Sequence, residues 1–299
     1  MGTRCTARPR TCTVETVGVE FGRVPGGSWD FASPATPGPG GAALIGYRDT
    51  GGGGLELRVA GVAAVTVLIE FGEHGLLIDD AGGRRALGGF VAGLPLDAMR
   101  IRGERAACVE VRVSPLRAYS LLGISPRDLG RGAVALEDLW GPRAVRLRER
   151  LAAARTWDER FTVTKSFLVE NDSVRSPDPQ VVESWHRIVG SGGRVRIGAL
   201  AESVGWSHKR LWGRFEAQIG LTPKRAAMLV RFRSAVDELL AGRPAAEVAV
   251  ACGYADQAHL CRDVSIFTEA TPGSLSANYL PLIARHRYRA WGKFFQDPV

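Results

Sequence analysis

The fold is decided by the stretch LAESVGWS at residues 200–207, which returns in altered form as VAVACGYAD at residues 248–256. Gly253 lies 48 residues after Gly205, whereas Asp256 lies 49 residues after Ser207, so the second copy has gained one residue within its turn. A Thr-Pro pair follows each copy, at residues 222–223 and 271–272. The repeat indicates two copies of one structural unit.

Each copy has the sequence form of two short helices joined by a turn. The glycine permits the left-handed backbone that ends the first helix, and the Ser or Asp side chain accepts amide hydrogens at the start of the second. Apolar residues four apart, Leu211 and Phe215 in one copy and Leu260 and Val264 in the other, mark the buried face of the second helix. This pattern is typical of a helix-turn-helix unit, whose second helix lies in a DNA major groove.

Length and composition predict a two-domain globular protein. The chain has 299 residues, of which 45% are hydrophobic and 23% charged. No apolar run approaches the ~20 residues of a membrane span. The first 13 residues contain three arginines without a following apolar stretch, so we expect no secretory signal and a cytoplasmic protein that associates with the nucleoid when bound to DNA. The five cysteines form no CxxC pair, which predicts reduced thiols.

The positive charge is concentrated on the part of the chain that holds the repeat. The net charge is +8, and residues 180–299 contain 16 Lys and Arg against 10 Asp and Glu, while residues 1–179 contain 23 against 21. Such an excess fits a surface that faces phosphates, although a solvated basic face without a function would have the same composition.

The N-terminal half is expected to be rich in β-structure. Residues 22–54 are rich in proline and glycine and are expected to form loops, with the four glycines at 51–54 as a turn. Short β-favouring runs then follow at residues 55–59, 64–71, 76–78, 87–91, 99–101 and 108–113. Strands of this length and spacing predict an antiparallel sandwich or a small barrel. Helices are expected next, at residues 116–122, from 128 onward, at 142–154 and at 157–170.

The polar stretch NDSVRSPDP at residues 171–179 is the best domain boundary. Beyond it, helical periodicity predicts helices at residues 181–189, 197–204, 208–219, 224–240, 246–252 and 257–267. We therefore predict an α+β protein. Its parts are a β-rich sensor or dimerisation domain at residues 1–170, a linker at 171–179, an all-α domain at 180–282 with two helix-turn-helix units joined by a linker helix, and a basic aromatic tail at 283–299.

At residues 180–280 the sequence resembles the AraC/XylS family of transcription regulators. The family signature is similar to G-[FY]-x-[DS]-x-x-[HY]-[FL]-x-R followed by T-P. In this chain the pattern is carried by Gly253, Tyr254, Asp256, His259, Leu260, Arg262, Thr271 and Pro272. The resemblance implies that the two recognition helices, held by the linker helix, reach successive major-groove segments of promoter DNA.

The outward positions of the two recognition helices supply the candidate DNA contacts. These candidates are Ser207, His208, Lys209, Arg210, Trp212, Arg214, Gln257, Ala258, His259, Cys261 and Arg262. By side-chain type, Gln257 pairs with adenine and Lys209 with guanine, and the arginines hold phosphates. Gly213 departs from the family pattern, which often has a polar or basic side chain there. Base reading by the first helix is therefore weaker, and the second helix carries more of the specificity.

Three of these features have a second interpretation. Trp212 touches a thymine methyl or packs on the neighbouring helix, and Arg262 holds a phosphate or forms an ion pair within the fold. The tail at 283–299, which alternates basic and aromatic residues, extends the DNA surface or, as we favour, folds back on the domain.

The resemblance also implies a cupin-like sensor in the N-terminal half, which binds a small molecule or mediates dimerisation. His74 is the single histidine in the first 185 residues, so three imidazoles cannot converge on a metal, and Glu73-His74 is read as a hairpin pair. The chain has no nucleophile elbow, Walker A loop or dinucleotide fingerprint. We therefore expect no enzyme activity, no metal and no cofactor.

The sequence thus predicts a sequence-specific DNA-binding transcription regulator. Its expected partners are promoter DNA, a small-molecule effector of unknown identity, a second copy of the chain and RNA polymerase, with no membrane partner. The alternative is a small-molecule-binding or catalytic β-domain in which the helical part serves assembly or targeting. A third reading, a DNA-repair sensor of the Ada type, needs four zinc-binding cysteines near the N-terminus, where only Cys5 and Cys12 occur.

Overall fold

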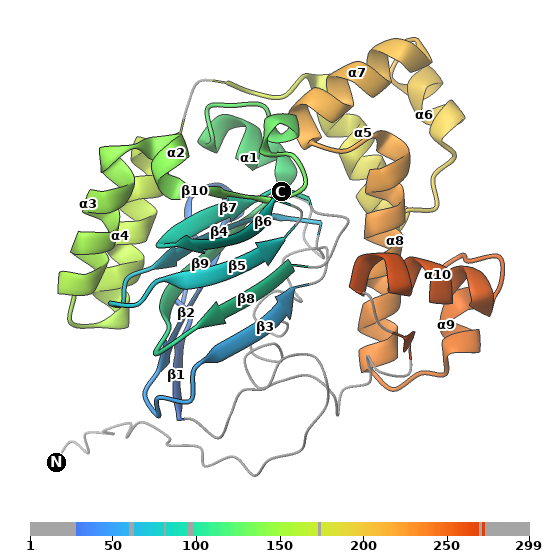
Figure 1. The fold of residues 1–299 in the computed structure, drawn as a ribbon. Coiled ribbons are helices and arrows are strands. Elements are labelled where there is room, and N and C mark those ends of the chain that lie inside the picture. Colours follow the sequence, from blue (N-terminus) through green and yellow to red (C-terminus); the bar gives the residue numbers. More distant parts are fainter. Residues whose placement is uncertain are drawn as a thin grey trace, which may run out of the picture.

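The N-terminal half of the computed structural model is built on two antiparallel sheets, and the C-terminal part is a chain of helices (Figure 1). The structure describes residues 28–59, 63–80, 82–94, 99–172, 175–268 and 271–272. The predicted α+β class and the predicted antiparallel sandwich are confirmed. The tail at 283–299 and the cysteines Cys5 and Cys12 lie outside the described residues.

The first sheet has six strands in the order β1-β2-β9-β4-β7-β10. Their bounds are β1 Trp29–Ala32, β2 Ala43–Asp49, β9 Ala107–Val113, β4 Val65–Glu70, β7 Gly89–Ala92 and β10 Ala133–Ala135. The second sheet has the order β3-β8-β5-β6. Its strands are β3 Leu55–Val59, β8 Met99–Gly103, β5 Leu76–Asp80 and β6 Gly83–Leu87. Every pairing within the two sheets is antiparallel.

The central strand β9 is buried on both faces. Val109, Val111 and Val113 belong to the core that the helices share, whereas Cys108 belongs to the core between the sheets. Because side chains alternate along a strand, Glu110 and Arg112 lie on the same face as Cys108, and they form a buried ion pair with a 3.1 Å contact. The remaining space between the sheets is filled by large apolar side chains.

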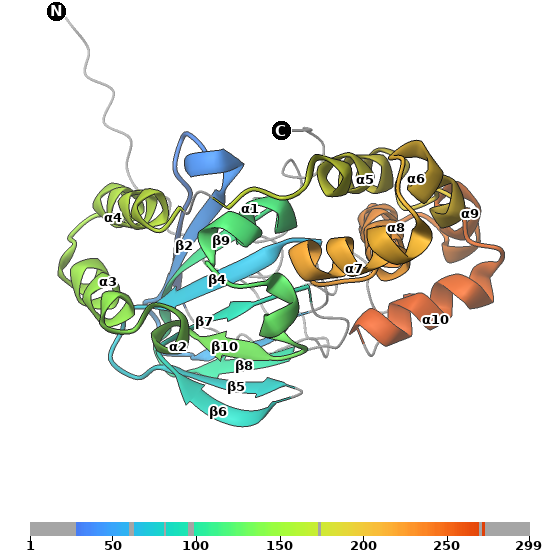
Figure 2. The ribbon, with the colours of Figure 1, turned by 90° about the horizontal axis from the view of Figure 1, so that it is seen from above.

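Six helical segments accompany the sheets in the N-terminal half (Figure 2). They are η1 Pro39–Gly41, α1 Pro115–Leu121, η2 Pro126–Leu129, α2 Leu136–Trp140, α3 Pro142–Ala153 and α4 Trp157–Glu170. Local sequence explains the start of α4, because Thr156 and Glu159 form a capping box that satisfies amides at both ends of the first turn. Among the described residues no helix combines the length and the apolar character that a membrane crossing requires.

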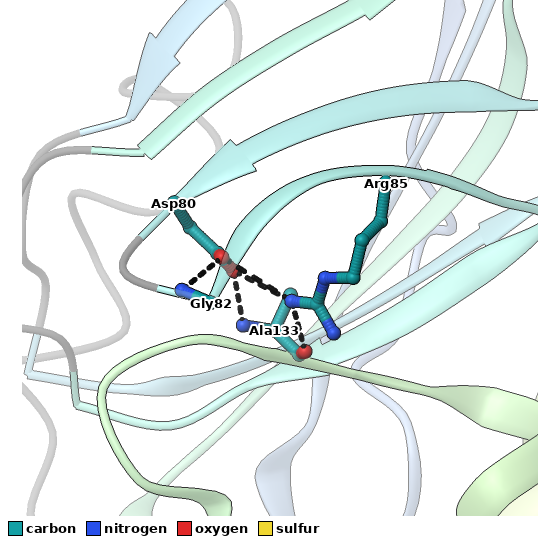
Figure 3. A network of polar contacts seen from close by, with 4 residues as sticks. All are labelled: Asp80, Gly82, Arg85 and Ala133. Carbon is teal, nitrogen blue, oxygen red and sulfur yellow. Dashed lines mark hydrogen bonds and ion pairs between the residues drawn. The ribbon is translucent and has the colours of Figure 1, made fainter.

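A polar network ties the two sheets together (Figure 3). The carboxylate of Asp80, at the end of β5, accepts the backbone N–H of Gly82 at 2.8 Å and that of Ala133 in β10 at 2.5 Å. Arg85 in β6 donates to the same carboxylate at 3.1 Å and to the carbonyl oxygen of Ala133 at 2.8 Å. The Asp80 side chain is 3% exposed, so this network joins the second sheet to an edge strand of the first from a buried position.

Six helices between residues 179 and 268 form the C-terminal part. They are α5 Pro179–Gly190, α6 Ile197–Ser203, α7 His208–Ile219, α8 Pro223–Leu240, α9 Ala245–Ala251 and α10 Gln257–Thr268. We call α6 and α7 the first unit and α9 and α10 the second unit. The predicted order of two units joined by a long linker helix, α8, is confirmed, and apolar residues such as Phe215, Phe232 and Phe267 fill its core.

The first unit also touches the N-terminal half, through α7, α1 and η2. Ser125, before η2, donates its hydroxyl hydrogen to the carbonyl oxygen of Ala217 at 2.5 Å. Gly220 ends α7 with φ +89°, and a Cβ there would meet the carbonyl oxygen of Pro126 at 3.1 Å. The buried apolar residues of the helices and of the outer face of the six-stranded sheet consequently form one continuous cluster.

The structure corrects several expectations for the N-terminal half. Residues 28–49, expected to be loop, contain β1, η1 and β2, and the expected strand at 87–91 is divided between β6 and β7. The strand β10 and the short helix α2 were not expected, and the helix expected from residue 128 is the 3-10 turn η2. Glu73 and His74 are not a hairpin pair, because the strands on either side of them, β4 and β5, belong to different sheets.

Candidate nucleic-acid interface

Both units begin their second helix with the cap that the sequence predicted. The Ser207 side chain accepts the backbone N–H of Arg210 at 3.3 Å at the start of α7, and the Asp256 side chain accepts that of His259 at 2.6 Å at the start of α10. Gly205 and Gly253 in the preceding turns have φ of +67° and +74°. These local contacts fix where each recognition helix begins and leave its first turn open to a ligand.

The first turn of α7 is polar and exposed. His208, Lys209 and Arg210 are exposed, whereas Leu211 is completely buried. The ring of His208 stacks on Trp212 with centroids 3.8 Å apart, so the half-buried Trp212 packs against its own helix surface. The Arg210 guanidinium lies 4.5 Å from the ring centre of Trp206. Lys209 and Arg210 are thus the cations that the first unit holds nearest to its helix start.

Arg214 is engaged in an ion pair that sequence periodicity did not reveal. Its guanidinium contacts both carboxylate oxygens of Asp178, at 2.6 and 2.8 Å. Asp178 precedes α5, and its backbone N–H donates to the side chain of Gln218 on α7 at 2.8 Å. The hydrogen bond from Arg214 lowers the pKa of the Asp178 carboxyl, against a smaller opposing effect of burial. Arg214 therefore ties α7 to α5, and its assignment as a phosphate contact stays a prediction.

The outer face of α10 carries the candidates of the second unit. Gln257, Ala258 and Arg262 are exposed, and Cys261 is half-buried. Arg262 donates from Nε to the carbonyl oxygen of Ala258 at 3.3 Å, and within the described ranges no carboxylate forms an ion pair with it. The interpretation of Arg262 as an internal ion-pair partner thus finds no support in the described part of the chain.

His259 occupies a different place from the other candidates. It is half-buried, and its ring meets that of Tyr254 edge to face at 5.1 Å. Its Nε2 lies 3.4 Å from Nη2 of Arg231 on α8. The structure therefore does not group His259 with the exposed residues of α10, because the ring faces the linker helix.

Further exposed cations surround the first unit and were not selected from the sequence. Arg194 and Arg196 precede α6, and Lys224 and Arg225 lie in the first turn of α8. The basic composition of residues 180–299 was the only signal for them. Together with Lys209 and Arg210 they give the first unit a surface suited to phosphates.

The N-terminal half has a hollow of about 580 Å³ at one end of the four-stranded sheet. Its polar lining includes His74 and the ion pair between Arg102 and Glu56, whose atoms are 3.1 Å apart. A hollow of this size falls in the range of small-molecule sites. Over the part of the chain that the structure describes, no three His, Cys, Asp or Glu side chains are grouped as metal ligands would be.

Comparison with known proteins gives one family match and several structural likenesses. Residues 200–278 match the model of a family described as a helix-turn-helix domain. No curated protein matches the chain.

The C-terminal domain of AraT, a response regulator from Geobacillus stearothermophilus, is 20% identical with a TM-score of 0.31, covering 33% of this chain and 84% of that one. ToxT from Vibrio cholerae is 11% identical with a TM-score of 0.44, covering 73% and 95%. The AraC-like transcriptional activator CuxR is 15% identical with a TM-score of 0.35, covering 64% and 75%. At these identities and scores the likenesses assign no ligand or partner to this chain.

Proposed function

We propose, for this DNA-binding transcription regulator with its AraC-type helix-turn-helix domain, that α7 and α10 lie in successive major-groove segments on one face of a promoter duplex. One observation carries the proposal. The chain presents two capped recognition helices with open, polar first turns, and the single linker helix α8 joins them. A duplicated unit of this kind matches the repeated geometry of a DNA groove.

The two helices have different tasks in this proposal. Gln257 and Ala258 lie exposed in the first turn of α10, where a side-chain amide reaches the edge of adenine, so the second unit reads most of the sequence. On α7, Lys209 and Arg210 are exposed, and the neighbouring Gly213 has no side chain to contact a base. The first unit therefore serves chiefly as an anchor on the phosphates.

The N-terminal half, in the same proposal, senses a small molecule or mediates dimerisation. The hollow at the end of the four-stranded sheet supports a sensor, and the contact of η2 with the C-terminal end of α7 supplies a path to the first unit. Val145 on α3 and Val169 on α4 are 42% and 59% exposed, which supports these helices as the dimer surface. Contact with RNA polymerase and residence in the cytoplasm belong to the proposal as well.

Titration of the full-length chain against labelled duplexes tests the proposal. One duplex comes from the upstream region of its own operon, and a random-sequence duplex of equal length is the control. We expect tighter binding to the upstream region at every salt concentration, with a steep loss of affinity as salt rises because phosphate contacts release counterions. Equal affinity for both duplexes would favour the alternative in which the helical part serves assembly or targeting.

A further inference from the structure

The two helix-turn-helix units meet at a joint that consists of more than the linker helix. We define the joint by five residues: Gly193, Arg194, Arg231, Tyr254 and Asp263. Gly193 and Arg194 belong to the loop between α5 and α6, Arg231 lies on α8, and the other two belong to the second unit. The joint thus brings together the segment before the first unit, the linker helix and the second unit.

On one side of the joint, the loop before α6 lies directly on the backbone of α8. Gly193 is buried with φ +75°, and a Cβ on it would lie 2.1 Å from the carbonyl oxygen of Ala227 and 2.8 Å from the backbone nitrogen of Arg231. Only glycine permits so close an approach. The next residue, Arg194, continues to the second unit, where its Cδ would lie 2.7 Å from a Cβ on Gly253.

On the other side, the Arg231 side chain reaches the start and the middle of α10. Nη2 of Arg231 contacts Oδ2 of Asp263 at 3.2 Å, with side chains that are 15% and 4% exposed. The guanidinium lies 4.5 Å from the ring centre of Tyr254, the residue after the turn glycine. His259 completes this environment with its Nε2 at 3.4 Å from Arg231. The planar guanidinium therefore holds one helix and one turn of the second unit at fixed positions.

We infer that Arg231 is a positioning residue, which fixes α10 relative to α7 and thereby selects the spacing of the two DNA segments that the protein accepts. This inference rests on the proposed function. A helix of 18 residues spans about 27 Å, and a helix alone leaves the rotation of the unit at its end free to vary. Successive major-groove segments lie ~34 Å apart, and each added base pair rotates the second segment by about a tenth of a turn. A rigid joint converts that rotation into a loss of affinity.

The test compares duplexes that differ only in spacing. The selected binding site is prepared with its two segments at the natural spacing and with one base pair added, and the full-length chain is titrated against both. For the unaltered chain we expect the insertion to weaken binding by about tenfold or more, as for a mismatched base pair. For a variant without the joint we expect weaker binding to the natural site and less than about a threefold further loss on insertion, because a loosened α10 follows the rotated segment.

The variant combines Arg231→Met with Asp263→Leu. Both partners are replaced together because removal of one leaves a buried charge without a partner, which destabilises the fold. The matched control combines Arg243→Met with Glu238→Leu, an exposed ion pair of 2.8 Å at the far end of α8. Far-ultraviolet circular dichroism verifies that both variants are folded. A spacing dependence equal to that of the unaltered chain in the Arg231 variant would overturn the inference, as would its loss in the control.

A measurement without DNA separates this inference from the proposed function. Spin labels replace Lys209 on α7 and Arg262 on α10, both exposed, in a background without other accessible cysteines. We expect a narrow distance distribution in the parent and the control and a broad one in the Arg231 variant. If the distributions behave so but no duplex shows a spacing dependence, the groove proposal fails and the joint stands. If the Arg231 variant keeps the narrow distribution, the joint fails.

Discussion

Three glycines of the first unit allow the same substitution to probe three different physical effects. Gly205 has φ +67° and open space where a Cβ would be, Gly213 is helical and exposed with open space, and Gly220 has φ +89° with Pro126 next to it. Alanine at each position adds one methyl group. The sign and size of its effect on the free energy of unfolding then report helix propensity, left-handed strain and the contact with η2 in turn.

The structure gives a magnitude for each substitution. Gly213→Ala should raise the free energy of unfolding by about 0.5–1 kcal/mol, because alanine loses less backbone entropy than glycine in a helix. Gly205→Ala should lower it by about 1–2 kcal/mol through left-handed strain alone. Gly220→Ala carries the same strain and, in addition, about 1–3 kcal/mol for overpacking, since its Cβ would lie 3.1 Å from the carbonyl oxygen of Pro126.

Urea unfolding of the full-length chain, followed by circular dichroism and tryptophan fluorescence, measures the three changes. The order of stability should be Gly213→Ala, unaltered chain, Gly205→Ala and Gly220→Ala, from highest to lowest. Equal costs for Gly205→Ala and Gly220→Ala would show that η2 does not press against the end of α7. A destabilising Gly213→Ala would refute the description of position 213 as an exposed helical site.

The remaining predictions concern DNA recognition, the sheets and acid stability. Gln257→Ala should change the base preference of the bound site, whereas Arg210→Ala should weaken all sites alike and reduce the slope of log K against log salt by about 1; a binding assay over sequence variants and salt concentrations distinguishes them, and equal effects on specificity would contradict the division of tasks. Asp80→Ala should lower the free energy of unfolding by about 2–3 kcal/mol, because two backbone amides and Arg85 lose a buried acceptor, while the exposed Asp79→Ala serves as the control and should stay within about 0.5 kcal/mol. Arg214→Gln should cost about 0.5–1 kcal/mol at neutral pH. Because Arg214 lowers the folded-state pKa of Asp178, this stabilisation is present above the ordinary aspartate pKa of about 4 and disappears as the pH falls through the lowered value, so unfolding curves at pH 7 and below about pH 3 should differ in the effect of the substitution.

The C-terminal helices were predictable because their signals are local. Caps such as Ser207 and Asp256, turn glycines and apolar residues four apart all lie within one or two turns of the boundary that they determine. The strand β2 was missed for a non-local reason. Its Gly46 lies where a Cβ would meet the ring of Trp157, 111 residues later in the chain, and the proline- and glycine-rich flanks concealed the alternation of Leu44, Ile45 and Tyr47.

The candidate interface was predictable to the extent that exposure follows periodicity. Lys209, Arg210, Gln257 and Arg262 lie exposed, as their positions on the two helices indicated. Periodicity does not identify partners from other elements. Asp178 lies 36 residues before Arg214, and Arg231 lies 28 residues before His259, so neither contact has a signature in the local pattern.

The central claim is that α7 and α10 contact two major-groove segments on one face of a duplex. Selection of bound sequences from random DNA, followed by footprinting of the full-length chain on the selected site, tests it most directly. We predict two protected segments with centres about one helical turn, 10–10.5 base pairs, apart, with the stronger base preference in the segment that Gln257→Ala alters. A single protected segment, or two segments on opposite faces of the duplex, would contradict the account.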